Sequence, residues 1–320
     1  MARYCWLASY PKSGNTWFRM VVANLHAEDD EMIDINNLPE RGGIASARQP
    51  FDNILMVESG LLTHEETDRM RPMLHRFLAS EDDDDFSDPQ QRREEEDRVD
   101  AGIGLVKCHD AYTYTDRGEP LLGGSEAAHG AIVVMRDPRD VAPSLANHSG
   151  FDVDTAIASM GRRDFAFCGT RRNQPNQLRQ QLMGWSDWQA SWLDQQDIPV
   201  HPVRYEDMKR DPLETIGAAL EFAGRPADAA KLERAIDLAR FDRLREKEAD
   251  GGFREAPVGR TFFRRGESGG WRDELSGEQV AKIERDHAVI MDRLGYDRVT
   301  DGDDEAATPN GITQEAEGTL

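Results

Sequence analysis

The chain has 320 residues, a formal net charge of -22 and an isoelectric point near 4.8. This length can bury a full core, and the acidic balance disfavours nucleic acid and anionic membrane surfaces as partners because both would repel the chain. No segment approaches the roughly 20 consecutive apolar residues of a membrane span, so we expect a soluble, cytoplasmic protein.

The N-terminal segment predicts a strand, a loop and a helix. An apolar run over residues 4–8 is followed by Tyr-Pro-Lys-Ser-Gly-Asn-Thr-Trp at 10–17, and apolar residues then recur at helical spacing over 18–25. Such a loop directs backbone N–H groups and the positive end of the helix dipole at an anion. It is not a Walker A motif, because Lys12 precedes the Ser-Gly pair. Taken alone, the loop also fits an ordinary strand-helix turn.

The next segment combines helical spacing with a run of charge. Residues 55–78 predict a helix, and residues 81–97 are strongly acidic, with four consecutive aspartates and three consecutive glutamates. We interpret 81–97 as a solvated, mobile insertion. The alternative is an acidic lid that selects cationic acceptors.

Further strands and helices alternate along the rest of the chain. The predicted strands are 102–109, 131–135 and 200–205, and the predicted helices are 177–193, 212–223 and 227–239. This alternation predicts a single α/β domain over 1–299, with a central parallel β-sheet flanked by helices. Residues 300–320 form an acidic tail that we expect to be disordered.

Ligands of such sheets bind at the carboxyl ends of the strands. The predicted strands place polar or aromatic side chains at these ends: Lys12, Lys107, His109, Arg136 and Tyr205. We therefore expect the functional site at this edge.

The three cysteines are scattered along the chain, and Cys5 and Cys108 fall in predicted strands. Their spacing, together with Cys168, matches neither a disulfide framework nor a zinc site. We expect reduced core thiols. No acidic or His/Cys cluster has convincing metal-ligand spacing, so we predict no metal.

These motifs occur in the same order as those of the cytosolic sulfotransferases, which transfer a sulfuryl group from 3′-phosphoadenosine 5′-phosphosulfate (PAPS). Residues 10–17 resemble that family's Tyr-Pro-Lys-Ser-Gly-Thr-Thr-Trp loop, with Asn15 in place of the first threonine. The resemblance implies a P-loop-like sulfotransferase fold, with Trp17 stacked on the adenine. It assigns the 5′-phosphate to Lys12, Ser13, Gly14, Asn15 and Thr16. Because asparagine also donates hydrogen bonds, we expect binding to be kept.

Lys107-Cys108-His109 resembles the family's Lys-Thr-His at a strand end. Residues two apart on a strand share a face, so Lys107 and His109 can act together while Cys108 points away. The resemblance implies that His109 is the catalytic base and that Lys12 and Lys107 stabilise charge on the transferring group. The base must be neutral, and we expect its pKa to lie close to the ordinary value.

The segment from Arg136 to Ser144 resembles the family's 3′-phosphate site, and the planar guanidinium suits bidentate phosphate recognition. A simpler interpretation is a helix start at 137–138 followed by a surface ion pair, Arg139–Asp140. It leaves Arg136 unexplained. We expect His148, farther along the same helix, to be structural.

Tyr205 begins a Tyr-Glu-Asp-Met-Lys string, in which the family's tyrosine contacts the adenine. Residues 263–271 resemble a late loop that covers the 3′-phosphate with Arg264, Arg265 and Gly266. Arg265 replaces the usual lysine and keeps its charge. Gly270 replaces the usual aspartate, and we expect this change to loosen the turn. Two arginines near glycines also fit a solvated turn.

The implied reaction is direct in-line transfer to a hydroxyl or amine of a small-molecule acceptor, without a metal. The variable segments 29–53, 81–97 and 151–181 should shape the acceptor site, but they carry no recognisable signature. One alternative is a divergent P-loop small-molecule kinase that uses Mg-ATP, and another is a nucleotide-binding module without catalysis. The oligomeric state stays open, a homodimer included.

Overall fold

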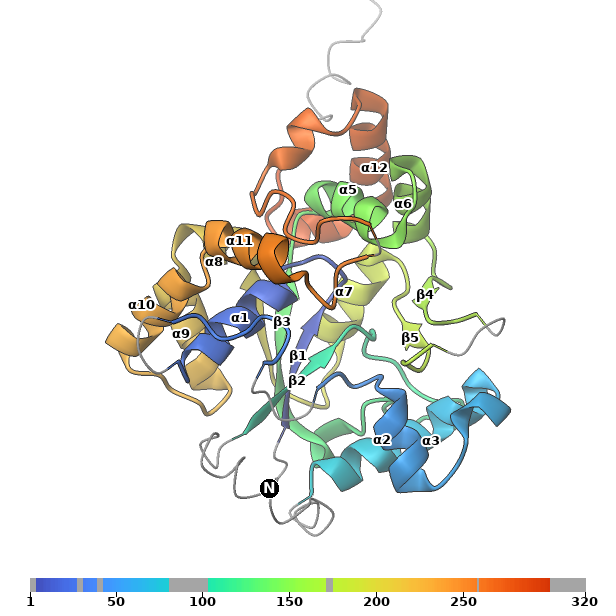
Figure 1. Ribbon diagram of the computed structural model, residues 1–320. Helices are drawn as coiled ribbons and strands as arrows, with labels where there is room; N and C mark the ends of the chain where they lie inside the picture. Colours follow the sequence, from blue (N-terminus) through green and yellow to red (C-terminus); the bar gives the residue numbers. More distant parts are fainter. Residues whose placement is uncertain are drawn as a thin grey trace, which may run out of the picture.

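The computed structural model describes residues 4–27, 31–38, 43–80, 103–170, 175–257 and 259–299. Within these ranges the centre is a four-stranded parallel sheet of order β2-β1-β3-β6 (Figure 1). Its strands are β1 (Tyr4–Ser9), β2 (Gly104–Cys108), β3 (Ala128–Met135) and β6 (Val200–Arg204). The strands β4 (Ala166–Phe167) and β5 (Gln180–Gln181) form a separate antiparallel pair.

Both faces of the sheet are buried, because successive strand residues contribute to two different hydrophobic clusters. In β1, Trp6 and Ala8 join one cluster while Cys5 and Leu7 join the other. The first cluster includes residues of α5 (Pro138–Ser149), α6 (Val153–Met160), α7 (Trp185–Asp194) and α12 (Gly277–Arg293). The second includes residues of α1 (Asn15–Asn24), α8 (Tyr205–Arg210), α9 (Pro212–Phe222), α10 (Ala229–Leu238) and α11 (Phe241–Gly251). The predicted single α/β domain with a flanked parallel sheet is confirmed.

A smaller unit lies beyond the sheet. The helices α2 (Arg48–Leu55) and α3 (His64–Leu78) pack on each other through Phe51 and Leu74, with the 3-10 turn η1 (Ser59–Leu61) between them. Two further 3-10 turns are η3 (Gly124–Glu126) and η4 (Gly270–Asp273). No described helix has the length and apolar character needed to cross a membrane.

The four predicted sheet strands are confirmed, although their ends shift. Two predicted helices are wrong in their first halves. The helix expected over 55–78 is interrupted because Met56 is left-handed (φ 53°), and α3 begins only after the capping box of Thr63. The helix expected over 177–193 begins at Trp185, because β5 precedes it and Met183 has a φ of 59°.

Cys5 and Cys108 are buried in the core as predicted, but the prediction for Cys168 is wrong. Cys168 is half-buried, has a positive φ of 54° and lines the cavity described below. The acidic segment 81–97 and the tail 300–320 lie outside the described residues, so the predictions made for them stay predictions.

Candidate active site

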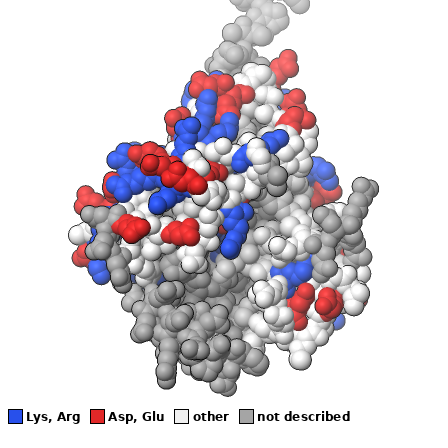
Figure 2. All heavy atoms as spheres, in the orientation of Figure 1, with Lys and Arg blue, Asp and Glu red and all other residues white. Residues whose placement is uncertain are grey.

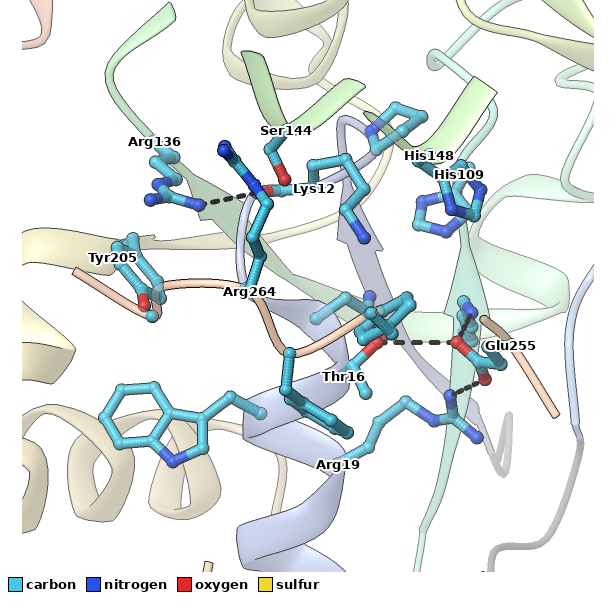
Figure 3. A pocket seen from close by; sticks show the side chains of 18 of the residues that line it. Lys12, Thr16, Arg19, His109, Arg136, Ser144, His148, Tyr205, Glu255 and Arg264 are labelled. Carbon is cyan, nitrogen blue, oxygen red and sulfur yellow. Dashed lines mark hydrogen bonds and ion pairs between the residues drawn. The ribbon is translucent and has the colours of Figure 1, made fainter. Parts of the chain in front are cut away.

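A cavity of about 810 Å³ opens at the carboxyl ends of the central strands (Figure 3). It brings together every predicted site residue except Ser13: Lys12, Gly14, Asn15, Thr16, Trp17, Lys107, His109, Arg136, Ser144, Tyr205, Arg264, Arg265 and Gly266. Ser13 is fully buried and does not line the cavity. Its Oγ has no hydrogen-bond partner among the described residues.

The loop between β1 and α1 has a strained backbone that only some residues tolerate. Lys12 and Gly14 both have positive φ angles, 71° and 111°. A Cβ at position 14 would lie 2.6 Å from the Tyr205 ring, so glycine is required there. The turn brings the first residues of α1, whose N–H groups have no helical partner, to the cavity wall.

Asn15 fastens this loop to the sheet. Its Nδ2 donates to the carbonyl of Leu7 over 2.9 Å. The substitution of threonine by asparagine therefore places the amide donor inside the protein. Asn15 helps to shape the loop from behind while Thr16 presents its hydroxyl at the cavity.

Lys12 is partly buried at the cavity wall. Burial and the nearby charge of Lys107 lower the pKa of Lys12 to about 7. Its Nζ lies 3.5 Å from the centroid of the Phe262 ring. Among the described residues no carboxylate forms an ion pair with it. An anion in the cavity would satisfy this charge.

Arg136 is aimed across the cavity mouth from the end of β3. It donates to the carbonyls of Lys12 (3.2 Å) and Glu267 (2.7 Å), and its guanidinium stacks 4.3 Å above the Tyr205 ring. Its Nε is buried without a partner among the described residues. Figure 3 shows Ser144 and Arg264 on the same side of the cavity.

The late loop carries Arg264, which forms an ion pair with Glu274, and Arg265, which lies 3.3 Å from Asp273. Gly266 has a φ of 66°, and a Cβ there would lie 2.1 Å from the Phe241 ring. The loop therefore packs tightly against α11.

The expectation that Gly270 loosens this loop is wrong. The carboxylate of Asp140, on α5, accepts hydrogen bonds from the backbone N–H groups of Gly269 (2.7 Å) and Trp271 (2.9 Å). A surface Arg139–Asp140 pair is also excluded. Arg139 is buried and pairs with Asp137 (2.7 Å) and Glu284 (2.5 Å).

His109 is held in one tautomer. Its Nδ1 lies 2.8 Å from the carbonyl oxygen of Ser9, which can only accept, so Nδ1 carries the proton and Nε2 keeps its lone pair. Trp188 donates to the backbone carbonyl of His109 over 2.9 Å. Burial, reinforced by Lys107, lowers the pKa of His109 to about 3. The expectation of an ordinary pKa is therefore wrong, and the imidazole is neutral at all physiological pH values.

The aromatic side of the cavity lies between α1 and α11. Trp17 donates from Nε1 to the carbonyl of Ala239 (3.0 Å) and contacts Tyr205 edge to face. Phe241 and Leu244 complete this wall. It offers a flat apolar slot of the kind that a purine base occupies.

The sequence analysis missed several wall residues or gave them other roles, among them Arg19, His148 and Glu255. Arg19 follows Thr16 by one helical turn, so its position on the same face could have been predicted. Glu255 is 148 residues from Lys107, its partner at 2.9 Å, and no local pattern pointed to it. His148, expected to be structural, lines the cavity, and burial lowers its pKa to about 4.

Among the described residues, no group of three or more His, Cys, Asp or Glu side chains is arranged to hold a metal ion. The roles of the individual residues stay predictions. What the geometry establishes is a site rich in cations, with an apolar slot on one side and a neutral histidine on the other.

Comparison with known proteins places this site in a family. The chain is 25% identical to cytosolic sulfotransferase 17 of Arabidopsis thaliana over 293 residues, which cover 87% of this chain and 71% of that protein. It is 29% identical to flavonol 3-sulfotransferase of Flaveria bidentis over 119 residues. That match spans 34% of this chain and only 36% of the flavonol enzyme.

Solved structures share the fold at lower identity. Retinol dehydratase in complex with androsterone and the inactive cofactor PAP superposes with a TM-score of 0.54 at 15% identity, covering 90% of this chain and 80% of that one. Mouse sulfotransferase SULT7A1 complexed with PAP gives a TM-score of 0.51 at 15% identity, covering 90% and 84%. The sulfotransferase domain family matches residues 129–295, which is more than half of the chain. This protein therefore belongs to the sulfotransferase family.

Proposed function

We propose that the protein transfers a sulfuryl group from PAPS to a hydroxyl, or an amine, of a small-molecule acceptor. Family membership supports this reaction, as does the binding of PAP by two structural neighbours, retinol dehydratase and mouse SULT7A1. The observation that carries the proposal is the amine of Lys12, in the loop before α1, which forms no ion pair with a carboxylate of the described residues and lines the same cavity as the neutral His109. Cations placed this way stabilise negative charge that develops during transfer.

The residues present fit the donor. Among the buried side-chain atoms without a partner in the described residues is Nε of Arg136, a cavity-lining donor that an anion could satisfy. Arg136, Ser144 and Arg264 would hold the 3′-phosphate, with Arg265 and Gly266 completing the loop over it. The loop that carries Lys12 would hold the 5′-phosphate. Trp17 and Tyr205 would enclose the adenine.

The donor supplies the sulfuryl group. In the balanced reaction the acceptor oxygen forms a bond to sulfur, the bond between sulfur and the bridging 5′-phosphate oxygen breaks, and 3′,5′-diphosphoadenosine leaves. His109 would take the acceptor proton on Nε2, because Nδ1 is already committed to Ser9. Lys12 would neutralise the leaving phosphate, and Lys107 the sulfuryl oxygens.

The acceptor would approach from the side of β4 and β5. The backbone N–H of Ala111 donates to the carbonyl of Gln181 over 2.7 Å, which fixes β5 beside the turn that follows His109. The cavity wall there includes His148, Phe167 and Gln180. Androsterone and retinol occupy two complexes of the related retinol dehydratase. A similarly sized alcohol or phenol is the acceptor class that we propose.

The test measures release of 3′,5′-diphosphoadenosine from PAPS in the presence of phenols and apolar alcohols. We expect acceptor-dependent turnover that falls by about 10²- to 10⁴-fold in His109→Asn, the range expected when a general base is removed. Circular dichroism checks that the variant is folded. Unchanged turnover in that variant would overturn the base assignment. Absence of acceptor-dependent release from the wild-type protein across the panel would count against sulfuryl transfer.

The small-molecule kinase predicted as an alternative is disfavoured by membership of the sulfotransferase family. A nucleotide-binding module without turnover is disfavoured by His109, because a neutral, oriented imidazole in the cavity has no role in binding alone.

A further inference from the structure

Glu255 lies at the centre of the proposed donor site, on the segment that follows α11. Its Oε2 is 2.9 Å from Nζ of Lys107 and 3.4 Å from Oγ1 of Thr16. Its Oε1 is 2.7 Å from Nη1 of Arg19. Figure 3 shows these contacts converging on one carboxylate.

This carboxylate is permanently charged. Although burial opposes ionisation, the neighbouring cations Lys107 and Arg19 hold the pKa of Glu255 far below its usual range. The cavity therefore already contains one anion at every working pH. The carboxylate accepts hydrogen bonds from Thr16 and Arg19 on α1 and from Lys107 at the end of β2. A phosphate or sulfate would also bind at this place.

A carboxylate and a phosphosulfate group use the same N–H and O–H donors, and the two negative charges repel each other. Thr16, assigned to the 5′-phosphate, cannot orient its hydroxyl proton toward Glu255 and toward a ligand at once. Lys107, assigned to the sulfuryl oxygens, is likewise held by Glu255. The donor must therefore compete with this side chain.

Displacement requires only the side chain to move. The backbone just before Glu255 is held by Asn36, which donates to the carbonyl of Gly252 (3.0 Å) and accepts from the N–H of Arg254 (2.7 Å). After it, the N–H of Ala256 donates to the carbonyl of Phe253 (2.9 Å). The Glu255 side chain itself is 29% exposed, so rotation toward solvent is open to it.

We propose that the Glu255 carboxylate occupies the 5′-phosphosulfate site in the free protein and must be displaced when the nucleotide binds. Glu255 would thus be an internal stand-in for the phosphosulfate group. The inference rests on the proposed function and adds a residue that sets donor affinity. Because the carboxylate returns when the site empties, it also favours release of 3′,5′-diphosphoadenosine. A ligand that binds only one of two states has its affinity reduced by the fraction of protein in the other state.

The experiment is calorimetric titration of wild type and Glu255→Gln with two ligands, 3′,5′-diphosphoadenosine and adenosine 3′-phosphate. Glutamine keeps the size of the side chain and removes its charge. We expect the variant to bind the diphosphate about tenfold more tightly. Adenosine 3′-phosphate lacks the 5′-anion and leaves Glu255 in place, so its affinity should change by less than about twofold.

The matched control is Glu233→Gln, which removes the same charge from an exposed position on α10 outside the cavity. It should bind both ligands like wild type. Should Glu255→Gln fold poorly, Glu255→Ala serves as the second variant with the same expected gain.

If wild type and both Glu255 variants bind the diphosphate with equal affinity, the proposed role of Glu255 is wrong, while the proposed function is unaffected. Equal gains for both ligands would also overturn it, because they would indicate a general charge effect. If no protein binds the diphosphate, the proposed function itself fails, and the inference fails with it.

Discussion

Lys12 shows how a single residue can combine strain, burial and charge at one point. Its positive φ turns the chain after β1, and its Nζ lies against the Phe262 ring at the cavity wall. Such a lysine binds a proton less readily than one in water, so its pKa falls to about 7. An anion in the cavity would restore the charged form.

This electrostatic coupling predicts proton uptake on nucleotide binding. Above pH 7 the free protein holds Lys12 largely neutral, whereas the bound diphosphate favours the ammonium. The affinity for 3′,5′-diphosphoadenosine should therefore be highest below pH 7 and fall by about tenfold for each pH unit above it. Calorimetry in buffers of different ionisation enthalpy at pH 8 should register protons taken up.

Lys12→Arg is the control for that titration, because arginine stays charged throughout this range. The variant should bind the diphosphate with little pH dependence between 7 and 9. A wild-type affinity that does not change across the same range would contradict the role of Lys12.

The lowered pKa of His109 predicts where kcat/KM falls at low pH. Because its pKa is lowered to about 3, the imidazole stays neutral and able to accept a proton well below the pH at which an ordinary histidine becomes charged. The acidic limb of kcat/KM should therefore lie below about pH 5. Stopped assays between pH 4.5 and 7 should therefore show kcat/KM nearly constant above pH 5. A midpoint near 6.5 would show that the site opens to solvent before catalysis.

At the scale of elements, the turn after β2 is fixed by a buried ion pair with α3. Arg71 and Asp110 are 0% and 1% exposed and lie 2.7 Å apart, next to His109. Removing one partner leaves a buried charge without compensation. Arg71→Met should therefore lower the free energy of unfolding by about 3–5 kcal/mol, measured by urea denaturation.

The same helix supplies a control pair at its surface, Arg69–Asp116. Arg69→Met should leave the urea midpoint nearly unchanged, because solvent screens exposed ion pairs. Similar losses in both variants would mean that the Arg71 effect reflects helix propensity and not the buried charge.

Elements with a strong local pattern could be predicted from the sequence. The apolar runs of β1 and β3 and the loop around Lys12 each consist of consecutive residues. A local sequence pattern is therefore enough to predict them. The helices over 55–78 and 177–193 were mispredicted because Met56 and Met183 adopt left-handed conformations, which residues of this type rarely adopt. Helical spacing alone does not reveal such interruptions.

The polar contacts across the site were less predictable. Asp140, which caps the late loop through two backbone N–H groups, and Glu255, which joins Lys107 and Arg19, both act over more than 100 residues of chain. These interactions depend on how the loops pack and not on a local period. The sequence therefore placed Lys12, Lys107 and Arg136 at the cavity, but it did not reveal Arg19 or the carboxylates that contact these cations.

At the scale of the whole molecule, a strongly acidic chain forms a cavity whose ligand-facing charges are largely basic. On the face shown in Figure 2, acidic and basic side chains intermingle over the helices of the upper half without forming a continuous basic surface. Salt screens the repulsion between a polyanionic ligand and the net charge of -22 beyond about one Debye length. Near the cavity, the ligand is attracted by the local basic side chains.

The measurement that tests this account most directly is parallel calorimetric titration with 3′,5′-diphosphoadenosine, adenosine 5′-phosphate and Mg-ATP in one buffer, for wild type and Arg136→Ala. We predict that the diphosphate binds most tightly and that Arg136→Ala weakens it by at least about tenfold, because a charged partner of the 3′-phosphate is lost. The variant should bind adenosine 5′-phosphate as the wild type does. Preference for Mg-ATP, or an Arg136 variant that binds the diphosphate as tightly as wild type, would contradict the account.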